Sequence, residues 1–165
     1  MKHAMRPANA GGWTRRGVLR AGLAAVPASV ALTLTVQPAE ATTETMREAI
    51  RKVAADAPIK RGRVKLEIPP LSENGNSVSC TVTVESPMTE ADHVKAIHVF
   101  NEKNPQPNVI GVHLGPRAGK ARIDTRIRLS ETQTVTAIAQ MSDGSFWSDS
   151  ANVIVTLGAC VEDAQ

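Results

Sequence analysis

Beyond residue 60 the sequence alternates between apolar and polar side chains, and this pattern constrains the fold more than any other feature. Residues 78–84 show it most clearly, because valine or cysteine fills every second position from Val78 to Val84. Successive side chains of a β-strand point to opposite faces of a sheet, so such a segment fits a strand with one buried face. The pattern predicts strands at residues 64–68, 78–84, 94–100, 109–114, 121–129, 133–141 and 151–157.

Turn-forming residues separate these segments at short intervals, and such residues favour chain reversal over strand continuation. The turn signals are Pro69-Pro70, Asn74-Gly75-Asn76, Ser86-Pro87 and Asp143-Gly144-Ser145. Many short strands with regular turns predict an all-β fold, an immunoglobulin-like antiparallel β-sandwich. The residues of segment 121–129 that we expect to face inward are Ile123, Thr125, Ile127 and Leu129.

One helix precedes the expected strands. Thr45 and Glu48 predict a capping box at its start, and Ala57-Pro58 is expected to end it. We therefore expect an N-terminal helix within residues 42–58, a sandwich over residues 59–158 and a C-terminal tail over residues 159–165. The apolar residues that share one face at helical spacing are Met46, Ala49, Ile50, Val53 and Ala54.

The first 41 residues are expected to be a secretory signal that is removed. They combine five basic residues, an apolar stretch at residues 21–36 and the small-residue pattern Ala39-Glu40-Ala41, which predicts cleavage before Thr42. The apolar stretch is shorter than the roughly 20 residues that a transmembrane helix needs. Arg15-Arg16 in its sequence context predicts the twin-arginine (Tat) export route and a periplasmic protein. An ordinary secretory signal that contains adjacent arginines is the alternative.

The charge of the whole chain reflects this signal. Residues 1–41 hold five of the 19 Lys and Arg and one of the 16 Asp and Glu, which leaves 14 basic against 15 acidic residues. The remaining chain therefore has no basic excess for binding nucleic acid. Its only aromatic residues are Phe100, Phe146 and Trp147, so no basic patch interleaved with aromatic side chains is present either.

The remaining chain offers little catalytic chemistry. Its histidines are His93, His98 and His113, and none has the spacing of a metal-ligand pair. The sequence holds no nucleophile elbow, no glycine-rich phosphate loop and no Cys-x-x-Cys motif. We therefore expect neither a metal nor a cofactor, and a protein that is not an enzyme by itself.

Two cysteines differ in their surroundings. Cys80 lies in line with Val78 and Val82 on the apolar face of an expected strand, where burial would make it inert. Cys160 follows the last expected strand by a few residues and stands five residues before the end of the sequence. A thiol on such a tail can be presented to the active site of another protein, as a covalent carrier requires. A structural disulfide between Cys80 and Cys160 is the alternative.

Several stretches resemble the SoxY family, and they follow one another in the family's order over most of residues 60–160. The Tat-type signal precedes them, as it does in the family. The stretches are Leu71-Ser72-Glu73-Asn74-Gly75-Asn76, Glu85-Ser86-Pro87-Met88-Thr89, Asn104-Pro105-Gln106-Pro107, Thr125-Arg126-Ile127-Arg128-Leu129 and Asp143-Gly144-Ser145.

The resemblance implies an immunoglobulin-like sandwich that pairs with a SoxZ-like subunit as a heterodimer. It also implies that the tail cysteine, here Cys160, carries sulfur intermediates covalently during thiosulfate oxidation. The SoxAX cytochrome would load this cysteine with thiosulfate, SoxB would remove sulfate, and SoxCD, where present, would oxidise the remaining sulfane sulfur. The carrier itself would catalyse none of these steps.

The tail departs from the family's Gly-Gly-Cys-Gly-Gly sequence. Gly158 and Cys160 match it, but Ala159 replaces the second glycine and Val161 follows the cysteine. Valine is stiffer than glycine, and the acidic residues at 162–163 would repel an anion such as thiosulfate. Three interpretations remain open: a working thiosulfate carrier, a SoxY-like paralogue that carries another thiol adduct, and a structural or binding sandwich without cysteine chemistry.

Overall fold

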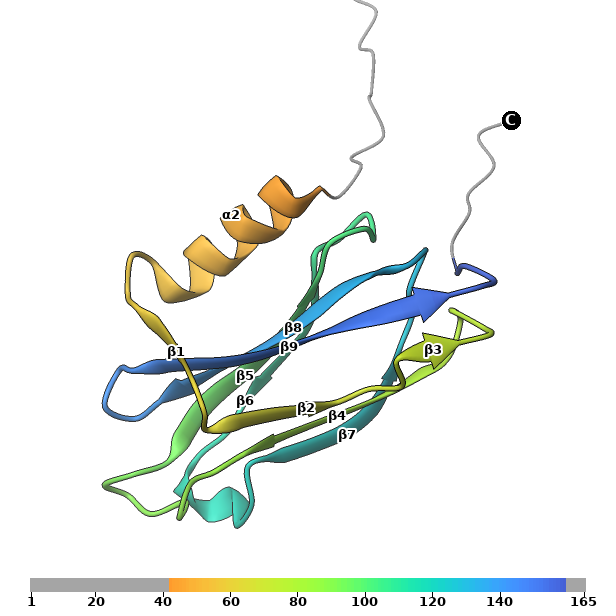
Figure 1. Ribbon diagram of the computed structural model, residues 1–165. Helices are drawn as coiled ribbons and strands as arrows, with labels where there is room; N and C mark the ends of the chain where they lie inside the picture. Colours follow the sequence, from red (N-terminus) through yellow and green to blue (C-terminus); the bar gives the residue numbers. More distant parts are fainter. Residues whose placement is uncertain (1–41, 160–165) are drawn as a thin grey trace, which may run out of the picture. The chain divides into compact units, whose positions relative to one another are not determined.

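The structure, a computed structural model, describes residues 42–159. Two β-sheets face each other across a core, and one helix lies over the outer face of the larger sheet (Figure 1). The elements are α2 (Thr43–Ala54), β1 (Ile59–Arg61), β2 (Val64–Glu67), β3 (Leu71–Ser72), β4 (Val78–Val84), β5 (Val94–Asn101), β6 (Asn108–His113), the 3-10 helix η1 (Pro116–Ala118), β7 (Arg122–Ile127), β8 (Gln133–Met141) and β9 (Phe146–Val155).

The strand order explains how the sandwich closes. The larger sheet has six strands in the order β1-β9-β8-β5-β6, with β3 paired to the far end of β9, and the smaller sheet has the order β2-β4-β7. Pairing is antiparallel except where β1 and β3 each run parallel to β9. The apolar faces of β4, β5 and β8 meet between the sheets, where Val82, Ile97 and Val135 are almost completely buried. The all-β, immunoglobulin-like sandwich predicted from the alternation is therefore confirmed.

Each predicted strand is present, with three differences. The last strand begins at Phe146 and not at residue 151, because the turn at 143–145 leads directly into it. Thr125 is exposed although an inward position was predicted, since β7 is an edge strand of the smaller sheet. The short parallel strands β1 and β3 were not predicted, because their two or three residues leave no visible alternation.

Helix α2 uses its predicted apolar face. Met46 and Ala54 are buried, and the half-buried Ala49, Ile50 and Val53 pack with them. The partners on the outer face of the larger sheet are Phe100, Ile138 and Phe146. A second small core therefore forms between the helix and the sheet, separate from the core between the sheets.

The predicted capping box at Thr45 and Glu48 is wrong by three residues. Thr42 is the N-cap, with extended backbone, and its hydroxyl accepts a hydrogen bond from the Thr45 backbone N–H at 3.4 Å. The Thr45 hydroxyl accepts in turn from the Thr42 N–H at 2.7 Å, so threonine supplies the return bond that glutamate was expected to make. The helix ends at Ala54, before Ala57-Pro58.

The loops of the sandwich gather at its two opposite ends. The loops before β4, between β7 and β8, and after β9 meet at the end of the sandwich where β9 ends (Figure 1). The loops between β4 and β5, between β6 and β7, and between β8 and β9 lie at the opposite end. Within residues 42–159 no helix is long and apolar enough to cross a membrane.

Phe100 offers a test of the core beneath the helix. Its side chain is completely buried among Met46, Ile138 and Phe146. Phe100→Ala is expected to lower the free energy of unfolding by about 3–5 kcal/mol, because the substitution leaves a cavity. Chemical denaturation measures this change, and Ile59→Ala, at an exposed apolar position, is the control. A loss below about 1 kcal/mol for Phe100→Ala would contradict the packing described.

Candidate functional site

Cys160, the predicted attachment site, lies outside the described residues, but the structure describes the segment that leads to it. The backbone is defined up to Ala159, the residue immediately before the cysteine. We call the residues that hold this segment the tail root. They are Gly75, Leu129, Ser130, Leu157, Gly158 and Ala159.

Three backbone hydrogen bonds join the segments of the tail root in series. The Gly75 N–H donates to the Leu157 carbonyl at 2.7 Å, and the Leu129 N–H donates to the Gly75 carbonyl at 2.8 Å. The Ala159 N–H then donates to the Leu129 carbonyl at 2.8 Å. Ala159 has no exposed surface, so the chain is fixed and covered one residue before Cys160.

Close backbone contact explains why Gly75 and Gly158 are glycines. A Cβ on Gly158 would collide with the Ser130 carbonyl oxygen, and a Cβ on Gly75 would collide with the Leu129 carbonyl oxygen. Neither glycine has a positive φ, so the requirement is for space and not for a left-handed conformation. Gly158, which the sequence suggested as part of a flexible arm, is thus packed against the loop between β7 and β8.

Asn104 holds this loop from the other side. Its Nδ2 donates to the Arg128 carbonyl at 2.7 Å, and its Oδ1 accepts from the Ser130 backbone N–H at 3.0 Å. The buried Gln133 donates a further bond to the same Oδ1, also at 3.0 Å. Asn104 therefore positions the two residues, Leu129 and Ser130, that contact Ala159 and Gly158.

Sequence reasoning named Gly158, Ala159 and Cys160 but gave no role to Gly75 or Asn104. Both residues stand in stretches that resemble the SoxY family, and that resemblance was the only available signal. Gly75 was interpreted as part of a turn, and the turn is present. Its bond to Leu157, more than 80 positions away in the chain, has no local signature in the sequence.

A glycine substitution tests the tail root. Gly158→Ala is expected to lower the free energy of unfolding by about 1–3 kcal/mol, because the added Cβ must displace the Ser130 carbonyl. Gly115→Ala is the matched control, since a Cβ there would meet no atom within 4 Å and the backbone φ of −141° suits alanine. Equal stability of the two variants in chemical denaturation would show that the tail root is not packed as described.

Cys80 is the buried cysteine of the described part of the chain. It faces the core from the middle of β4 with 1 % of its surface exposed, and it forms no disulfide among the described residues. Burial raises the pKa of its thiol to about 11. At neutral pH the thiol is therefore protonated, and only the thiolate is a good nucleophile.

The position of Cys80 also works against a bridge to the tail. Cys80 on β4 is paired with Thr125 on β7. Leu129, whose carbonyl accepts the hydrogen bond from Ala159, lies four residues after Thr125 in the chain. Extended backbone spans about 13 Å over four residues. A disulfide requires Cα atoms within about 7 Å of each other. Leu129 is thus offset from Cys80 along the chain, but Cys160 lies outside the described residues, so the alternative of a Cys80–Cys160 disulfide stays a prediction.

Thiol labelling tests this assignment. Iodoacetamide at pH 8 is expected to leave Cys80 unmodified in the folded protein and to modify it after denaturation, because folding both covers the thiol and raises its pKa to about 11. Peptide mass spectrometry measures the modification at each cysteine. Substitution of Cys80 by alanine should leave the labelling of the folded protein unchanged, and rapid labelling of Cys80 in the folded state would contradict its burial.

The three histidines of the described residues make separate contacts. Within residues 42–159 no group of three or more His, Cys, Asp or Glu side chains is arranged to hold a metal ion. His93 contacts the Thr89 carbonyl through Nδ1 at 3.0 Å. His98 lies beside His113, with 6.2 Å between ring centroids, and burial together with the charge of His113 lowers the pKa of His98.

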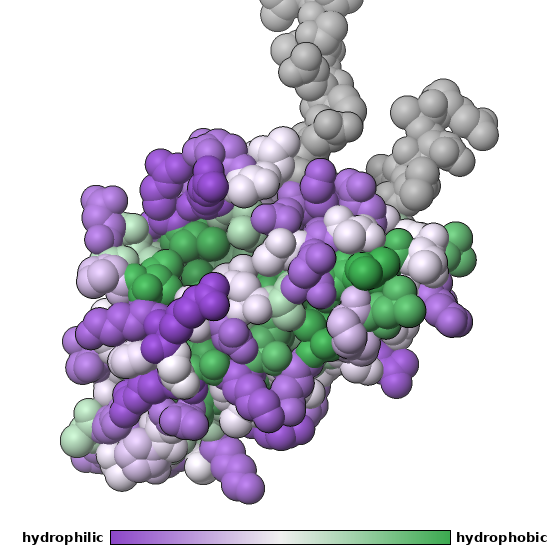
Figure 2. Space-filling model, in the orientation of Figure 1, coloured by the Kyte–Doolittle hydropathy of each residue, from purple (hydrophilic) through white to green (hydrophobic). Residues whose placement is uncertain are grey.

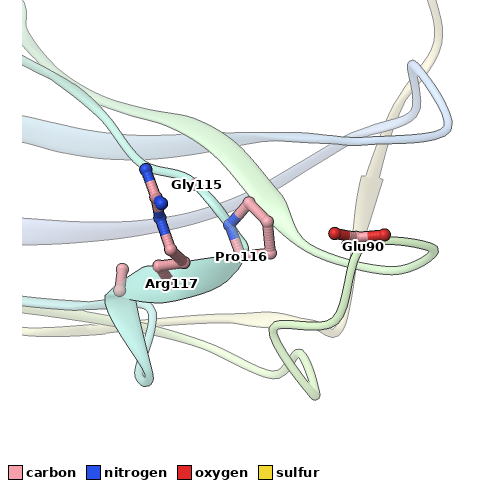
Figure 3. A pocket seen from close by; sticks show the side chains of 5 residues that line it. Glu90, Gly115, Pro116 and Arg117 are labelled. Atoms are coloured by element: carbon pink, nitrogen blue, oxygen red, sulfur yellow. The ribbon is translucent and has the colours of Figure 1, made fainter.

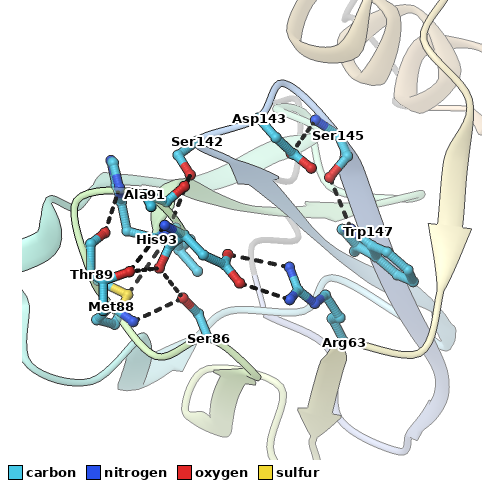
Figure 4. A network of polar contacts seen from close by, with 12 residues as sticks. Arg63, Ser86, Met88, Thr89, Ala91, His93, Ser142, Asp143, Ser145 and Trp147 are labelled. Carbon is cyan, nitrogen blue, oxygen red and sulfur yellow. Dashed lines mark hydrogen bonds and ion pairs between the residues drawn. The ribbon is translucent and has the colours of Figure 1, made fainter.

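The end of the sandwich opposite the tail root carries a hollow and a polar network. The hollow is open and is lined by Glu90, Arg117 and residues beside them (Figure 3). In the network, Arg63 donates two hydrogen bonds to the Asp92 carboxylate and lies over the Trp147 ring, 5.8 Å from its centroid (Figure 4). Neither feature contains a cysteine, and the network orders the loop that links β4 to β5.

Comparison with known proteins identifies the family. The family model described as "Sulfur oxidation protein SoxY" matches residues 50–160, a range that includes every residue of the tail root and ends at Cys160. The chain therefore belongs to the SoxY family. No curated protein sequence matches the chain.

Solved structures share the fold. The structure of the sulfur carrier protein SoxY from Chlorobium limicola f thiosulfatophilum is 24% identical, with a TM-score of 0.59, and the match covers 70% of this chain and all of that one. The superoxide reductase (neelaredoxin) from Ignicoccus hospitalis is 18% identical, with a TM-score of 0.51, over 69% of this chain and 93% of that one. Because both identities are below 25%, these likenesses show the fold of this chain and do not show its chemistry.

Proposed function

We propose that this protein is a covalent carrier of sulfur intermediates in periplasmic thiosulfate or sulfur oxidation, with Cys160 as the attachment site. The observation that carries the proposal is the tail root, which fixes the chain at Ala159 and leaves Cys160 as the next residue. Membership of the SoxY family supports the same role. The solved SoxY structure is described as that of a sulfur carrier protein.

The loading step joins the Cys160 sulfur to the outer sulfur of thiosulfate. The thiol loses its proton, a sulfur–sulfur bond forms, and an oxidised SoxAX cytochrome would accept the two electrons that are released. The product is a cysteine S-thiosulfonate, R–S–S–SO₃⁻. SoxB then adds water to the terminal sulfur–sulfur bond, which releases sulfate and one proton and leaves the persulfide R–S–SH. SoxCD, where present, oxidises this remaining sulfane sulfur.

The chain's own residues present the cysteine and perform none of these reactions. Cys80 stays protonated and covered, so one thiol per chain remains for loading. Membership of the SoxY family supports assigning the reactions to partner enzymes. We therefore propose a carrier that has no cofactor of its own.

Partners and location form part of the proposal. We expect a SoxZ-like subunit as the second half of a heterodimer, and SoxAX, SoxB and, where present, SoxCD as the enzymes that act on Cys160. Arg15-Arg16 supports export by the Tat route to the periplasm, but residues 1–41 lie outside the described part of the chain.

The tail sequence supports two alternatives to thiosulfate carriage. Val161 replaces a family glycine after Cys160, and the acidic residues at 162–163 oppose an anionic substrate. A SoxY-like paralogue would keep the fold and the SoxZ-like partner but carry another thiol adduct, or it would serve as a binding sandwich without carrier chemistry.

Intact-mass measurement tests the proposal. The purified protein is incubated with thiosulfate and an oxidised SoxAX-type cytochrome, beside Cys160→Ser and Cys80→Ala variants. An adduct of thiosulfate mass is expected on the wild type and on Cys80→Ala, because both retain the tail thiol, and not on Cys160→Ser. A reactive Cys160 that never gains the adduct would reject thiosulfate carriage and support the paralogue.

A further inference from the structure

A strip of exposed apolar side chains lies beside the tail root. Leu71, Ile154 and Leu157 are 53%, 51% and 64% exposed, the largest exposures of any large apolar residues within 42–159. Leu71 and Ile154 are direct neighbours in the parallel pairing of β3 with β9, and Leu157 follows three residues after Ile154. In Figure 2 this apolar surface is green over the end of β9 and beside β3.

The tail root limits how far Cys160 can move from this strip. Ala159, the residue before Cys160, is buried, and its N–H donates to the Leu129 carbonyl. Adjacent Cα atoms are 3.8 Å apart, and covalent geometry therefore keeps the cysteine sulfur within about 7 Å of the Ala159 Cα. An enzyme whose active site receives this sulfur must bring its own surface against the tail root and the residues around it.

We propose that the strip of Leu71, Ile154 and Leu157 is the surface on which an enzyme that acts on Cys160 docks. This inference rests on the proposed carrier function. Leu157 stands only two residues before Ala159, whose N–H is bonded to Leu129, so the strip adjoins the residue that precedes Cys160. Exposed apolar surface that becomes covered on docking favours association.

The charges around the strip indicate the chemistry of the enzyme's surface. Glu73 and Glu131 are exposed in the loops before β4 and before β8, and Glu131 also lies 3.9 Å from the Lys103 ammonium. Glu162 and Asp163 follow on the tail itself. The complementary surface is an apolar collar around the entrance of an active site, bordered by lysine or arginine side chains, which would also attract an anionic sulfur substrate.

Kinetic measurements on surface variants test the docking surface. The full chain carrying Leu157→Ser, Ile154→Ser or both is combined with its SoxZ-like subunit and loaded with thiosulfate by an oxidised SoxAX-type cytochrome, and kcat/KM is compared with that of the wild-type complex. We expect the double variant to lose about tenfold or more in kcat/KM, through a higher KM, because two apolar contacts are lost. Alkylation of Cys160 by iodoacetamide needs no docking and should be unchanged.

Ile59→Ser is the matched control. Ile59 is also an exposed large apolar residue, but it lies on β1 beside Phe146, at the opposite end of β9 from Ile154. Its substitution should leave kcat/KM unchanged. Loading of the double variant at the wild-type rate would overturn the docking surface alone, whereas a wild type with a reactive thiol that is never loaded would overturn the carrier function with it.

Light scattering on the same variants examines the competing occupant. If the wild type forms a homodimer, or a complex with the SoxZ-like subunit, that the double variant does not form, the strip binds that chain and the proposal is wrong. If the wild type and the double variant have the same mass, and only the variant is loaded more slowly, the strip is the surface that binds the enzyme.

Discussion

The hydrogen bond from the Ala159 N–H to the Leu129 carbonyl is the interaction on which the account of this protein depends. It closes a series that begins at Leu157 and passes through Gly75, and so it ties the end of β9 to the loops before β4 and before β8. Each of these segments belongs to a different part of the sequence, so only the complete sandwich brings them together. A correctly folded core is therefore a condition for a correctly presented tail.

This anchoring changes what the tail can do. A glycine-rich segment on both sides of a cysteine would give a slim and extensible arm. Here Gly158 is required for close packing against Ser130, and Ala159 is buried, so neither residue adds reach. The chain is instead held at Ala159, one residue before Cys160. The carrier that we propose would depend more on the fit between its surface and its partner than on the length of its arm.

Much of the fold follows from local patterns in the sequence. The alternation in β4 and the apolar face of α2 predicted both elements, because each pattern repeats over enough residues to define one buried side. Thr125 faced solvent against expectation, because periodicity does not reveal which strand lies at an edge. The tail root could not be predicted in the same way, since the bond between Gly75 and Leu157 joins distant segments and involves only backbone atoms. The resemblance to SoxY marked Gly75 and Asn104 as notable residues but did not say what they hold.

Amide hydrogen exchange at Ala159 tests the central claim most directly. Its N–H is bonded to Leu129 and its side chain is fully covered, so exchange should be at least about 100-fold slower than in the unfolded chain, and Gly158→Ala should accelerate it. Exchange of the Ala159 amide at a rate close to that of the unfolded chain would show that the tail is free before Cys160, and the anchored tail root would be wrong.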